Sequence, residues 1–173
     1  MSHDLRTGRL GLRPAGAADR DELHRHWSEP DVYRFLFDGV PPTAQEVDVL
    51  IADSARDFAA AGYGLWIART APEGPLVGTA GLRPLDDLGF EVHYSVAPEA
   101  WGKGYATEAA GAVVGHALGP LGLRFVLAEV DEANTASAAI VARLGLTPYE
   151  TVPGLLGPMT RYRRDAAPVT RTA

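Results

Sequence analysis

The stretch that decides the fold is Phe90-Glu91-Val92-His93-Tyr94-Ser95-Val96-Ala97-Pro98-Glu99-Ala100-Trp101-Gly102-Lys103-Gly104-Tyr105-Ala106-Thr107-Glu108-Ala109-Ala110. It predicts a strand, a short glycine-rich turn and the first turns of a helix. Such a turn leaves backbone N–H groups exposed at a helix N-terminus, which carries about half a positive charge. That arrangement suits a phosphate or a pyrophosphate. Gly102 and Gly104 place no Cβ in the way of a close ligand, and Lys103 adds a flexible cation between them.

Around this stretch the sequence switches repeatedly between strand and helix patterns. The expected strands cover residues 9–13, 64–69, 76–82, 90–96, 125–130, 146–152 and 159–163. The expected helices cover residues 17–27, 43–61, 106–117 and 135–144. Thr43 to Glu46 has the spacing of a capping box, and Glu29-Pro30-Asp31 is expected to end the first helix. The loop 153–158 should join the last two strands.

The resulting order of elements is β-α-α-β-β-β-α-β-α-β-β, which predicts an α/β fold with a mixed sheet. A chain of 173 residues fits one domain, which we place at residues 1–165, with a loose tail over 166–173.

Composition excludes several classes of protein. A net charge of −6 argues against general nucleic-acid binding, which needs a basic surface. The absence of cysteine excludes disulfides, thiolate metal sites and a cysteine nucleophile. No apolar run approaches the length of about 20 residues that spans a bilayer. The N-terminal residues lack the pattern of a secretory signal, so we expect a cytoplasmic protein.

A family resemblance emerges from the same central stretch. The sequence Trp101-Gly102-Lys103-Gly104-Tyr105-Ala106 resembles the Q/R-x-x-G-x-G/A acyl-CoA signature of the GNAT N-acetyltransferase superfamily, with Trp101 in place of the usual Gln or Arg. Asn134-x-x-Ser137 and Leu144-Gly145-Leu146 match the family further along the chain. With Thr107-Glu108-Ala109 after the glycines, the pattern is similar to the Rim-type ribosomal-protein N-terminal acetyltransferases. The resemblance extends from Leu5 to Arg164.

The resemblance implies both a fold and a cofactor site. The fold is a mostly antiparallel central sheet that splays between its central strands, flanked by about four helices, with acetyl-CoA in the gap. No metal is implied. The residues that the resemblance assigns to acetyl-CoA are Tyr94, Ser95 and Val96 along the pantetheine arm, Trp101, Gly102, Lys103, Gly104, Tyr105, Ala106 and Thr107 at the pyrophosphate, and Asn134 and Ser137 near the thioester.

Acetyl transfer to an amine needs a proton acceptor, because an alkylammonium has a pKa near about 10 and no free electron pair. Glu91 occupies the place of a carboxylate that Rim-type sequences often carry on this strand. In a strand of period two, Glu91, His93 and Ser95 share one face, so His93 lies beside Glu91. Either residue, or the pair, is the expected base. The alternative is that both are solvated on the open side of the splay.

The departing thiolate needs a proton donor, and the resemblance makes Ser137 the candidate acid. The alternative is a polar residue in the first turn of a helix, just as Asn134 is also a favoured N-cap without any ligand.

Other polar and aromatic residues give weaker indications of function. His24 and His26 are expected to be solvated rather than metal ligands. Glu129 and Asp131 are expected to bond loop backbone. Four aromatic residues either shape the acceptor pocket or, for the majority, form core: Trp27, Tyr33, Phe35 and Phe37.

The sequence therefore indicates an acetyl-CoA-dependent N-acetyltransferase. Transfer should be direct, since no cysteine can carry the acetyl group. The acceptor is either a protein N-terminus or a small amine, such as an antibiotic or a polyamine. A non-catalytic acyl-CoA-binding sensor is the alternative from another class. Neither nucleic acid nor a membrane is an expected partner. A homodimer is possible from the sequence, and the oligomeric state is left open.

Overall fold

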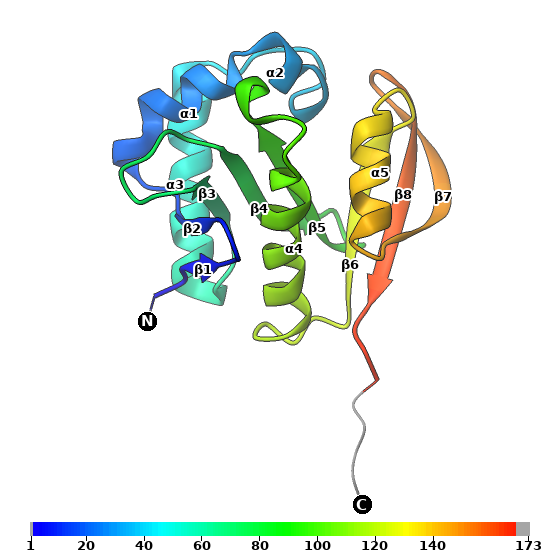
Figure 1. Ribbon diagram of the computed structural model, residues 1–173. Helices are drawn as coiled ribbons and strands as arrows, with labels where there is room; N and C mark the ends of the chain where they lie inside the picture. The colour runs from blue at the N-terminus through cyan, green and yellow to red at the C-terminus, as the bar shows by residue number, and fades with distance from the viewer. Residues whose placement is uncertain (1, 169–173) are drawn as a thin grey trace, which may run out of the picture.

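One mixed sheet of eight strands organises residues 2–168, which are the residues described by the computed structural model (Figure 1). The strands are β1 (Leu5–Arg6), β2 (Gly11–Pro14), β3 (Leu65–Arg69), β4 (Gly78–Leu85), β5 (Gly89–Val96), β6 (Phe125–Asp131), β7 (Thr147–Gly154) and β8 (Gly157–Asp165). They lie in the order β1-β2-β3-β4-β5-β6-β8-β7. The α-helices are α1 (Arg20–Trp27), α2 (Pro30–Leu36), α3 (Ala44–Ala61), α4 (Tyr105–Leu118) and α5 (Thr135–Arg143). Two short 3₁₀ turns are η1 (Ala17–Asp19) and η2 (Pro98–Ala100).

The sheet opens between its central strands. Every neighbouring pair is antiparallel except β5 and β6, which run parallel. Their register contains a single pair, Glu91 with Leu127, whereas β4 and β5 pair over eight positions from Gly78–Val96 to Leu85–Gly89. The ladder between β5 and β6 therefore ends early, and both strands have unpaired edges toward their C-terminal ends. The predicted α/β class and the predicted splay are both confirmed.

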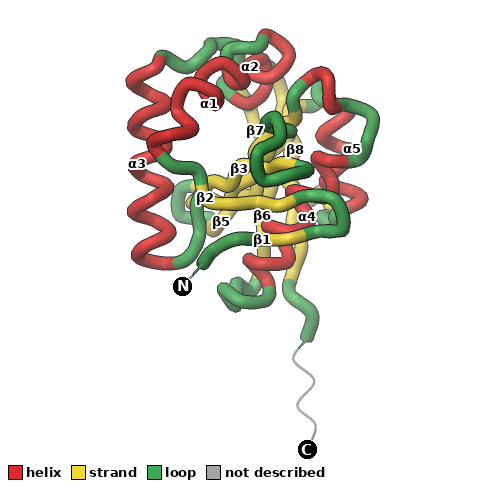
Figure 2. Tube along the Cα trace, turned by 60° about the vertical axis from the view of Figure 1, so that its left-hand side comes forward, coloured by secondary structure: helices red, strands yellow, loops and turns green. Residues whose placement is uncertain are grey.

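Helices cover both faces of the sheet, and β3 shows the division. Trp66 and Ala68 join a cluster with the buried face of α4, whereas Leu65 and Ile67 join a second cluster with α1 and α3. This alternation is what a strand buried on both faces requires. Helices α4 and α5 therefore define one face, and α1 to α3 cover the other (Figures 1 and 2).

Helix α2 corrects the sequence analysis. The first helix ends at Trp27, before Glu29-Pro30-Asp31, as expected, but Pro30 is also the first residue of a further helix that was not expected. Proline is well suited to that position because its fixed φ is helical and the missing N–H has no partner there anyway. Glu29 has extended φ and ψ angles of −69° and 127° and so separates α2 from α1. Residues 2–168 thus contain five α-helices rather than about four.

The last two strands also differ from expectation. Residues 153–158 do not form a loop, because Pro153 pairs with Pro158 and Gly154 pairs with Gly157. Only Leu155 and Leu156 turn the chain, and the side chain of Leu155 is 84% exposed. The hairpin consequently extends further than predicted and carries apolar side chains at its tip.

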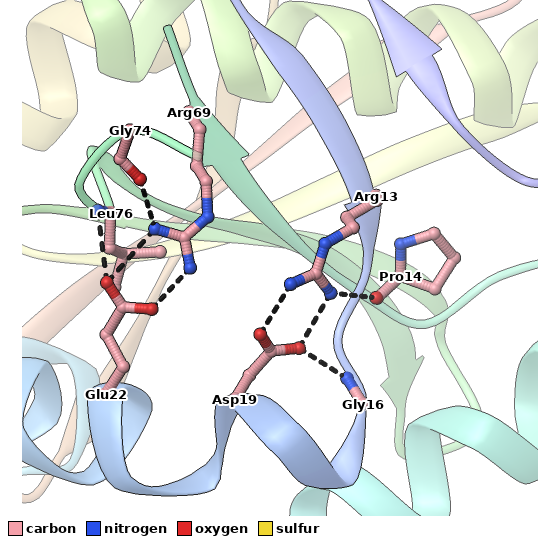
Figure 3. Close-up of polar contacts among 8 residues, drawn as sticks. All are labelled: Arg13, Pro14, Gly16, Asp19, Glu22, Arg69, Gly74 and Leu76. Atoms are coloured by element: carbon pink, nitrogen blue, oxygen red, sulfur yellow. Dashed lines mark hydrogen bonds and ion pairs between the residues drawn. The ribbon is translucent and has the colours of Figure 1, made fainter. Parts of the chain in front are cut away.

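Two ion pairs fasten the start of the first helical segment to the sheet (Figure 3). Arg13 of β2 donates to both carboxylate oxygens of Asp19, one of them at 2.8 Å, and Arg69 of β3 donates to Glu22 of α1. Burial raises the pKa of Asp19, but hydrogen bonds from Arg13 and from the N–H of Gly16 outweigh it, and the net pKa lies below its usual value. These pairs set the position of α1 over the sheet.

No helix in the described part of the chain is long and apolar enough to cross a membrane. Residues 166–168 have no regular structure, although the N–H of Ala166 donates to Arg124 O at 2.9 Å, and the rest of the predicted tail, 169–173, lies outside the described residues.

Candidate active site

A cavity of about 1240 Å³ runs through the splay of the sheet. Its lining comes from β5 and β6 and from the β7–β8 hairpin. The start of α4 and α5 line it on one face of the sheet, and α2 lines it on the other. The cavity thus gives access to the unpaired strand edges from both faces of the sheet. The segments predicted as a site from the sequence meet here.

The glycine-rich turn forms one end of this cavity. Gly102 and Gly104 have φ angles of +75° and +79°, in the left-handed region that favours glycine. Gly104 is the N-cap of α4 and offers no capping side chain. In residues 2–168, no backbone carbonyl accepts a hydrogen bond from the N–H groups of Gly102 to Thr107. Six consecutive donors at a positive helix end therefore remain available for an anion.

An arginine from the start of the chain supports this turn. Arg9 donates from Nη1 to the carbonyl of Lys103 at 2.8 Å and from Nε to Glu108 at 2.7 Å. Its guanidinium also lies 4.7 Å from the ring centre of Tyr105. The sequence analysis missed this support, because Arg9 and its partners are separated by more than ninety residues.

The other residues predicted around the turn lie in different environments. Trp101 is 51% exposed, and its Nε1 donates to the carbonyl of Val96 at 2.9 Å, which fixes the turn against the end of β5. Ala106 and Thr107 line the cavity in the first turn of α4. Lys103 is exposed and does not line the cavity in the described structure.

The backbone of β5 faces the gap at alternate residues. The N–H of Ala97 donates to Val77 O at 2.8 Å, next to the β4 ladder. Because backbone groups alternate along an antiparallel pair, those of Tyr94 and Val96 point away from β4 and toward the gap. The edge of β5 that a ligand in the gap would meet therefore consists of Tyr94 and Val96.

The side chains of β5 alternate in the other direction, between the two faces of the sheet. Tyr94 points to α5, where its hydroxyl lies 2.6 Å from Oγ of Ser137. Ser95 points to α1, where its Oγ lies 2.8 Å from Nε2 of His26. Glu91 and His93 share the face of Ser95, as the strand period predicts.

Glu91 is buried and paired. Its side chain is only 6% exposed, and its Oε1 accepts a hydrogen bond from Nε of Arg83 at 2.7 Å across the β4–β5 ladder. Burial raises the pKa of Glu91, and the positive charge of Arg83 opposes that rise without cancelling it. The alternative of a solvated Glu91 is therefore wrong. A buried carboxylate of raised pKa that lines a cavity is suited to accept a proton.

His93 lies against a glycine. A Cβ on Gly81, its cross-strand partner, would come within 2.4 Å of the imidazole, so the ring occupies the space that Gly81 leaves free. Burial lowers the pKa of His93 to about 3, which keeps the ring neutral and makes it a weak base at neutral pH. Among the described residues, Glu91 has Arg83 rather than His93 as its side-chain partner. Within residues 2–168, Glu91 and His93 therefore do not form a hydrogen-bonded pair.

His26 is a further correction. We expected a solvated surface histidine, but the side chain is buried and its Nε2 reaches Ser95, whose Oγ also lies 2.8 Å from Oγ1 of Thr79. Burial lowers the pKa of His26 to about 4. The side chains of His26, Ser95 and Thr79 thus link β4 and β5 to α1. The side chain of Ser95 is thus engaged on the α1 face, and its backbone groups point toward β4 rather than into the gap.

Asn134 and Ser137 lie at the start of α5. Asn134 is the N-cap, and its Oδ1 accepts the N–H of Ser137 at 3.1 Å. Both residues line the cavity. Burial raises the pKa of Tyr94 to about 12, so the phenol bonded to Ser137 keeps its proton. The hydroxyl of Ser137 thus contacts a second hydroxyl, which sequence reasoning had not paired with it.

The two acidic residues on β6 are not bonded to loop backbone as expected. Glu129 accepts a hydrogen bond from Nε of Arg161 on β8 at 2.7 Å. Asp131 is buried, and its Oδ1 has no hydrogen-bond partner within residues 2–168. Both line the cavity on the same face as Glu91.

Of the four aromatic residues, only Trp27 and Phe37 belong to a core cluster, so the expected core majority is not found. Trp27 is buried and packs edge-on against Phe37, with the ring centres 5.4 Å apart, in the core beneath α1 and α2. Phe35 instead lines the cavity. No group of three acidic or histidine side chains in residues 2–168 is arranged to hold a metal ion.

Comparisons with known proteins agree with this geometry. The family model for an acetyltransferase (GNAT) domain matches residues 9–147. The chain is 33% identical over 159 residues to the FsC-acetyl coenzyme A-N(2)-transacetylase of Aspergillus fumigatus, which covers 85% of this chain and 66% of that longer protein. A solved acetyltransferase from Agrobacterium tumefaciens is 25% identical and has a TM-score of 0.80 over 93% of both chains.

A second solved structure shares the fold alone. The ribosomal-protein-S5-alanine acetyltransferase from Vibrio fischeri has a TM-score of 0.77 with 14% identity, over 94% of this chain and 96% of that chain.

Proposed function

The chain belongs to the GNAT acetyltransferase family, and on that premise we propose that it transfers an acetyl group from acetyl-CoA directly to a primary amine. The observation that carries the proposal is the row of free N–H donors from Gly102 to Thr107, placed beside the unpaired edge of β5. An acyl-CoA has a pyrophosphate for the first feature and amide groups for the second. Both sets of hydrogen-bonding groups line the same cavity.

The donor row would bind the pyrophosphate of acetyl-CoA. Gly102 has nothing within 4 Å of a Cβ position, and at Gly104 only the flexible end of Arg9 comes near, at 3.5 Å. A phosphate can therefore approach the backbone closely. Arg9 holds the turn through Lys103 and Glu108, so the donors are oriented before the ligand arrives.

The pantetheine amides would continue along β5. Beyond the Glu91–Leu127 pair, β6 no longer pairs with β5, so the backbone groups of Tyr94 and the N–H of Val96 would bond these amides. The carbonyl of Val96 already accepts a hydrogen bond from Nε1 of Trp101. A backbone N–H of this edge can also polarise the thioester carbonyl, and binding supplies the proximity of the reactants.

The acceptor amine would enter from the α2 face, because Glu91 lies on that face. In the reaction the amine nitrogen forms a bond to the acetyl carbon and the carbon–sulfur bond breaks. Glu91 receives the proton of the amine, directly or through water, and Arg83 keeps the carboxylate ionised enough to do so.

The thiolate of CoA leaves on the α5 face. There Ser137 can donate its hydroxyl proton to the sulfur and regain one from Tyr94, to which it is bonded. The tyrosine is then restored from solvent. Base and acid would thus work from opposite faces of the same strand.

Two measurements on the full chain test the proposal. Acetyl-CoA should raise the thermal midpoint with increasing concentration, because it binds the folded state. Release of free CoA thiol should then be followed with alkylamines, diamines and short peptides with a free N-terminus as acceptors. Turnover with an amine supports the enzyme, whereas tight acetyl-CoA binding without turnover on any acceptor would make the chain a sensor.

A further inference from the structure

A buried carboxylate with one unpartnered oxygen lies at the wide end of the splay. Asp131, the last residue of β6, is 5% exposed, and within residues 2–168 its Oδ1 accepts no hydrogen bond. It lines the large cavity. A carboxylate oxygen in such a place loses its hydration without a hydrogen bond in return, and that arrangement is unfavourable for the folded protein alone. The feature indicates a group that arrives from outside.

The neighbours of Asp131 do not neutralise it. Glu91 and Glu129, the other carboxylates on this face, are already paired with Arg83 and Arg161. Burial raises the pKa of Asp131, and the negative charges of Asp38 and Glu129 add to the rise. Asp38 follows the end of α2 and lines the same cavity. Arg34 of α2 and Arg143 of α5 also line the cavity, but within residues 2–168 neither forms an ion pair with Asp131 or Asp38. The wide end of the cavity therefore holds two carboxylates that no described cation pairs with.

The register of the central strands fixes where this charge lies relative to the proposed base. Glu91 pairs with Leu127, and Asp131 is four residues further along β6. A strand rises by roughly 3.3 Å per residue, so Asp131 lies about 13 Å along the sheet from that pair. Both carboxylates face α2. An acceptor bound at Glu91 would extend along the cavity toward Asp131.

The walls between the two positions include apolar side chains. Phe35 of α2, Leu155 at the tip of the β7–β8 hairpin and Met159 of β8 line the cavity. Such walls suit a chain of methylene groups better than a polar backbone.

We propose that Asp131, assisted by Asp38, binds a second cationic group of the acceptor, so that the acceptor is an aliphatic diamine or polyamine. This inference rests on the proposed N-acetyltransferase function, since it places the reacting amine near Glu91. One amine of the acceptor loses a proton and is acetylated. The other remains an ammonium and forms a charge-assisted hydrogen bond with Asp131.

The test compares acceptors that differ only in the distal group. α,ω-Diamines of increasing chain length, the n-alkylamines of equal length and the corresponding ω-amino acids should be assayed for kcat/KM with saturating acetyl-CoA. We expect the longer diamines to exceed the matching monoamines by about tenfold or more, and the amino acids to be poorest. In Asp131→Asn the ratio between diamine and monoamine should fall toward one.

Control variants separate this effect from a general change of charge. Asp87→Asn removes one negative charge from the exposed β4–β5 turn, at the opposite end of β5, and should keep the diamine preference. Asp38→Asn changes an exposed residue and should lower the preference partly, even if Asp131→Asn were to fold poorly.

The experiment can contradict the role of Asp131 without contradicting the proposed acetyltransferase function. Equal kcat/KM for diamines and monoamines, or a preference that survives in both Asp131→Asn and Asp38→Asn, would overturn the inference while leaving the acetyltransferase intact. A basic N-terminal peptide that outperforms every diamine would also overturn it. If no amine is acetylated, the proposed function fails, and calorimetric titration of the wild type and Asp131→Asn with a long diamine still decides whether Asp131 binds the cation.

Discussion

The hydroxyl of Tyr94 lies 2.6 Å from Oγ of Ser137, and this contact joins β5 to α5. It lies beyond the point where β5 and β6 cease to pair. If this pair donates the proton to the departing sulfur, each hydroxyl depends on the other. A thiol with a pKa near about 8.5 is already a fairly good leaving group, so the help should be modest.

We therefore expect Ser137→Ala to lower kcat by about ten- to a hundredfold with little change in the affinity for acetyl-CoA. Tyr94→Phe should cost a similar factor, and the double variant should cost hardly more than either alone, because the two act as a unit. Steady-state kinetics and calorimetry measure these quantities. Ser28→Ala, at an exposed serine in the turn after α1, is the matched control. A loss of affinity without a loss of kcat would make Ser137 a positioning residue.

Glu91 should control the acidic limb of the pH–rate profile. Burial raises its pKa, so the carboxylate that accepts the proton is lost at a higher pH than for an ordinary glutamate, and kcat/KM should fall as pH falls through that raised value. Glu91→Gln should lower kcat by about a hundredfold or more at neutral pH. The loss should shrink at high pH, where free amine is abundant.

Arg83 provides the companion variant. It donates to Glu91 and lowers the pKa of that carboxyl, so Arg83→Gln should move the acidic limb toward higher pH, whereas Arg83→Lys should keep it closer to the wild type. A profile that Arg83→Gln leaves in place would show that Glu91 does not set it.

Gly104 offers a clean test of the phosphate-binding turn. It has a φ of +79°, and Gly122, in the turn after α4, has a φ of +64° with nothing within 4 Å of a Cβ position. Valine at either position forces a branched residue into left-handed backbone, at a cost on the order of 1–2 kcal/mol. Only Gly104→Val should also abolish the thermal shift produced by acetyl-CoA. Undiminished binding by Gly104→Val, measured against Gly122→Val, would remove the main support for the proposed cofactor site.

His26 should make the fold sensitive to mild acid. Burial lowers its pKa from 6.5 to about 4, so the unfolded chain binds a proton in this window that the folded protein does not. The contribution of His26 to stability is therefore complete above pH 6.5 and is lost as pH falls toward 4.

The free energy of unfolding in urea, measured from pH 4 to 7, checks this sign. The difference between wild type and His26→Gln should change with pH by at most about 1.4 kcal/mol per pH unit. Glutamine can still bond Ser95, so the neutral interaction is largely retained. A difference that is independent of pH would mean that the imidazole is not held neutral by the fold.

Local signals in the sequence were sufficient for most elements. The capping box at Thr43 and Glu46 begins α3, with the Glu46 N–H donating to Thr43 Oγ1 at 3.2 Å, and Gly62 ends it with a φ of +75°. The prediction of a GNAT acetyltransferase is confirmed by the family match over residues 9–147. It could be made from the sequence because the motif consists of residues that are adjacent in the chain. The end of α1 before Pro30 was predicted correctly, but the start of α2 at Pro30 was not, because proline is compatible both with a helix end and with the first position of a helix.

The site was harder to predict wherever it depends on residues far apart in the chain. Arg9 reaches Glu108 over 99 positions, and His26 reaches Ser95 over 69. No periodicity connects such pairs. The free oxygen of Asp131 likewise depends on how α2 and the β7–β8 hairpin close over the end of β6. The assignments of individual catalytic and cofactor-binding residues stay predictions for the experiments above.

The single register pair between β5 and β6 also bears on how the protein is made. Strands β1 to β5 are neighbours in the sheet in the same order as in the chain, and β6, β7 and β8 pair only among themselves apart from Glu91 with Leu127. Once α4 has left the ribosome, every ladder of the first five strands can close without waiting for the rest of the chain. The C-terminal ladder then closes as a second, local unit. The same opening that leaves room for a ligand thus lets the strand ladders on its two sides close separately during synthesis, before their side chains join in one core.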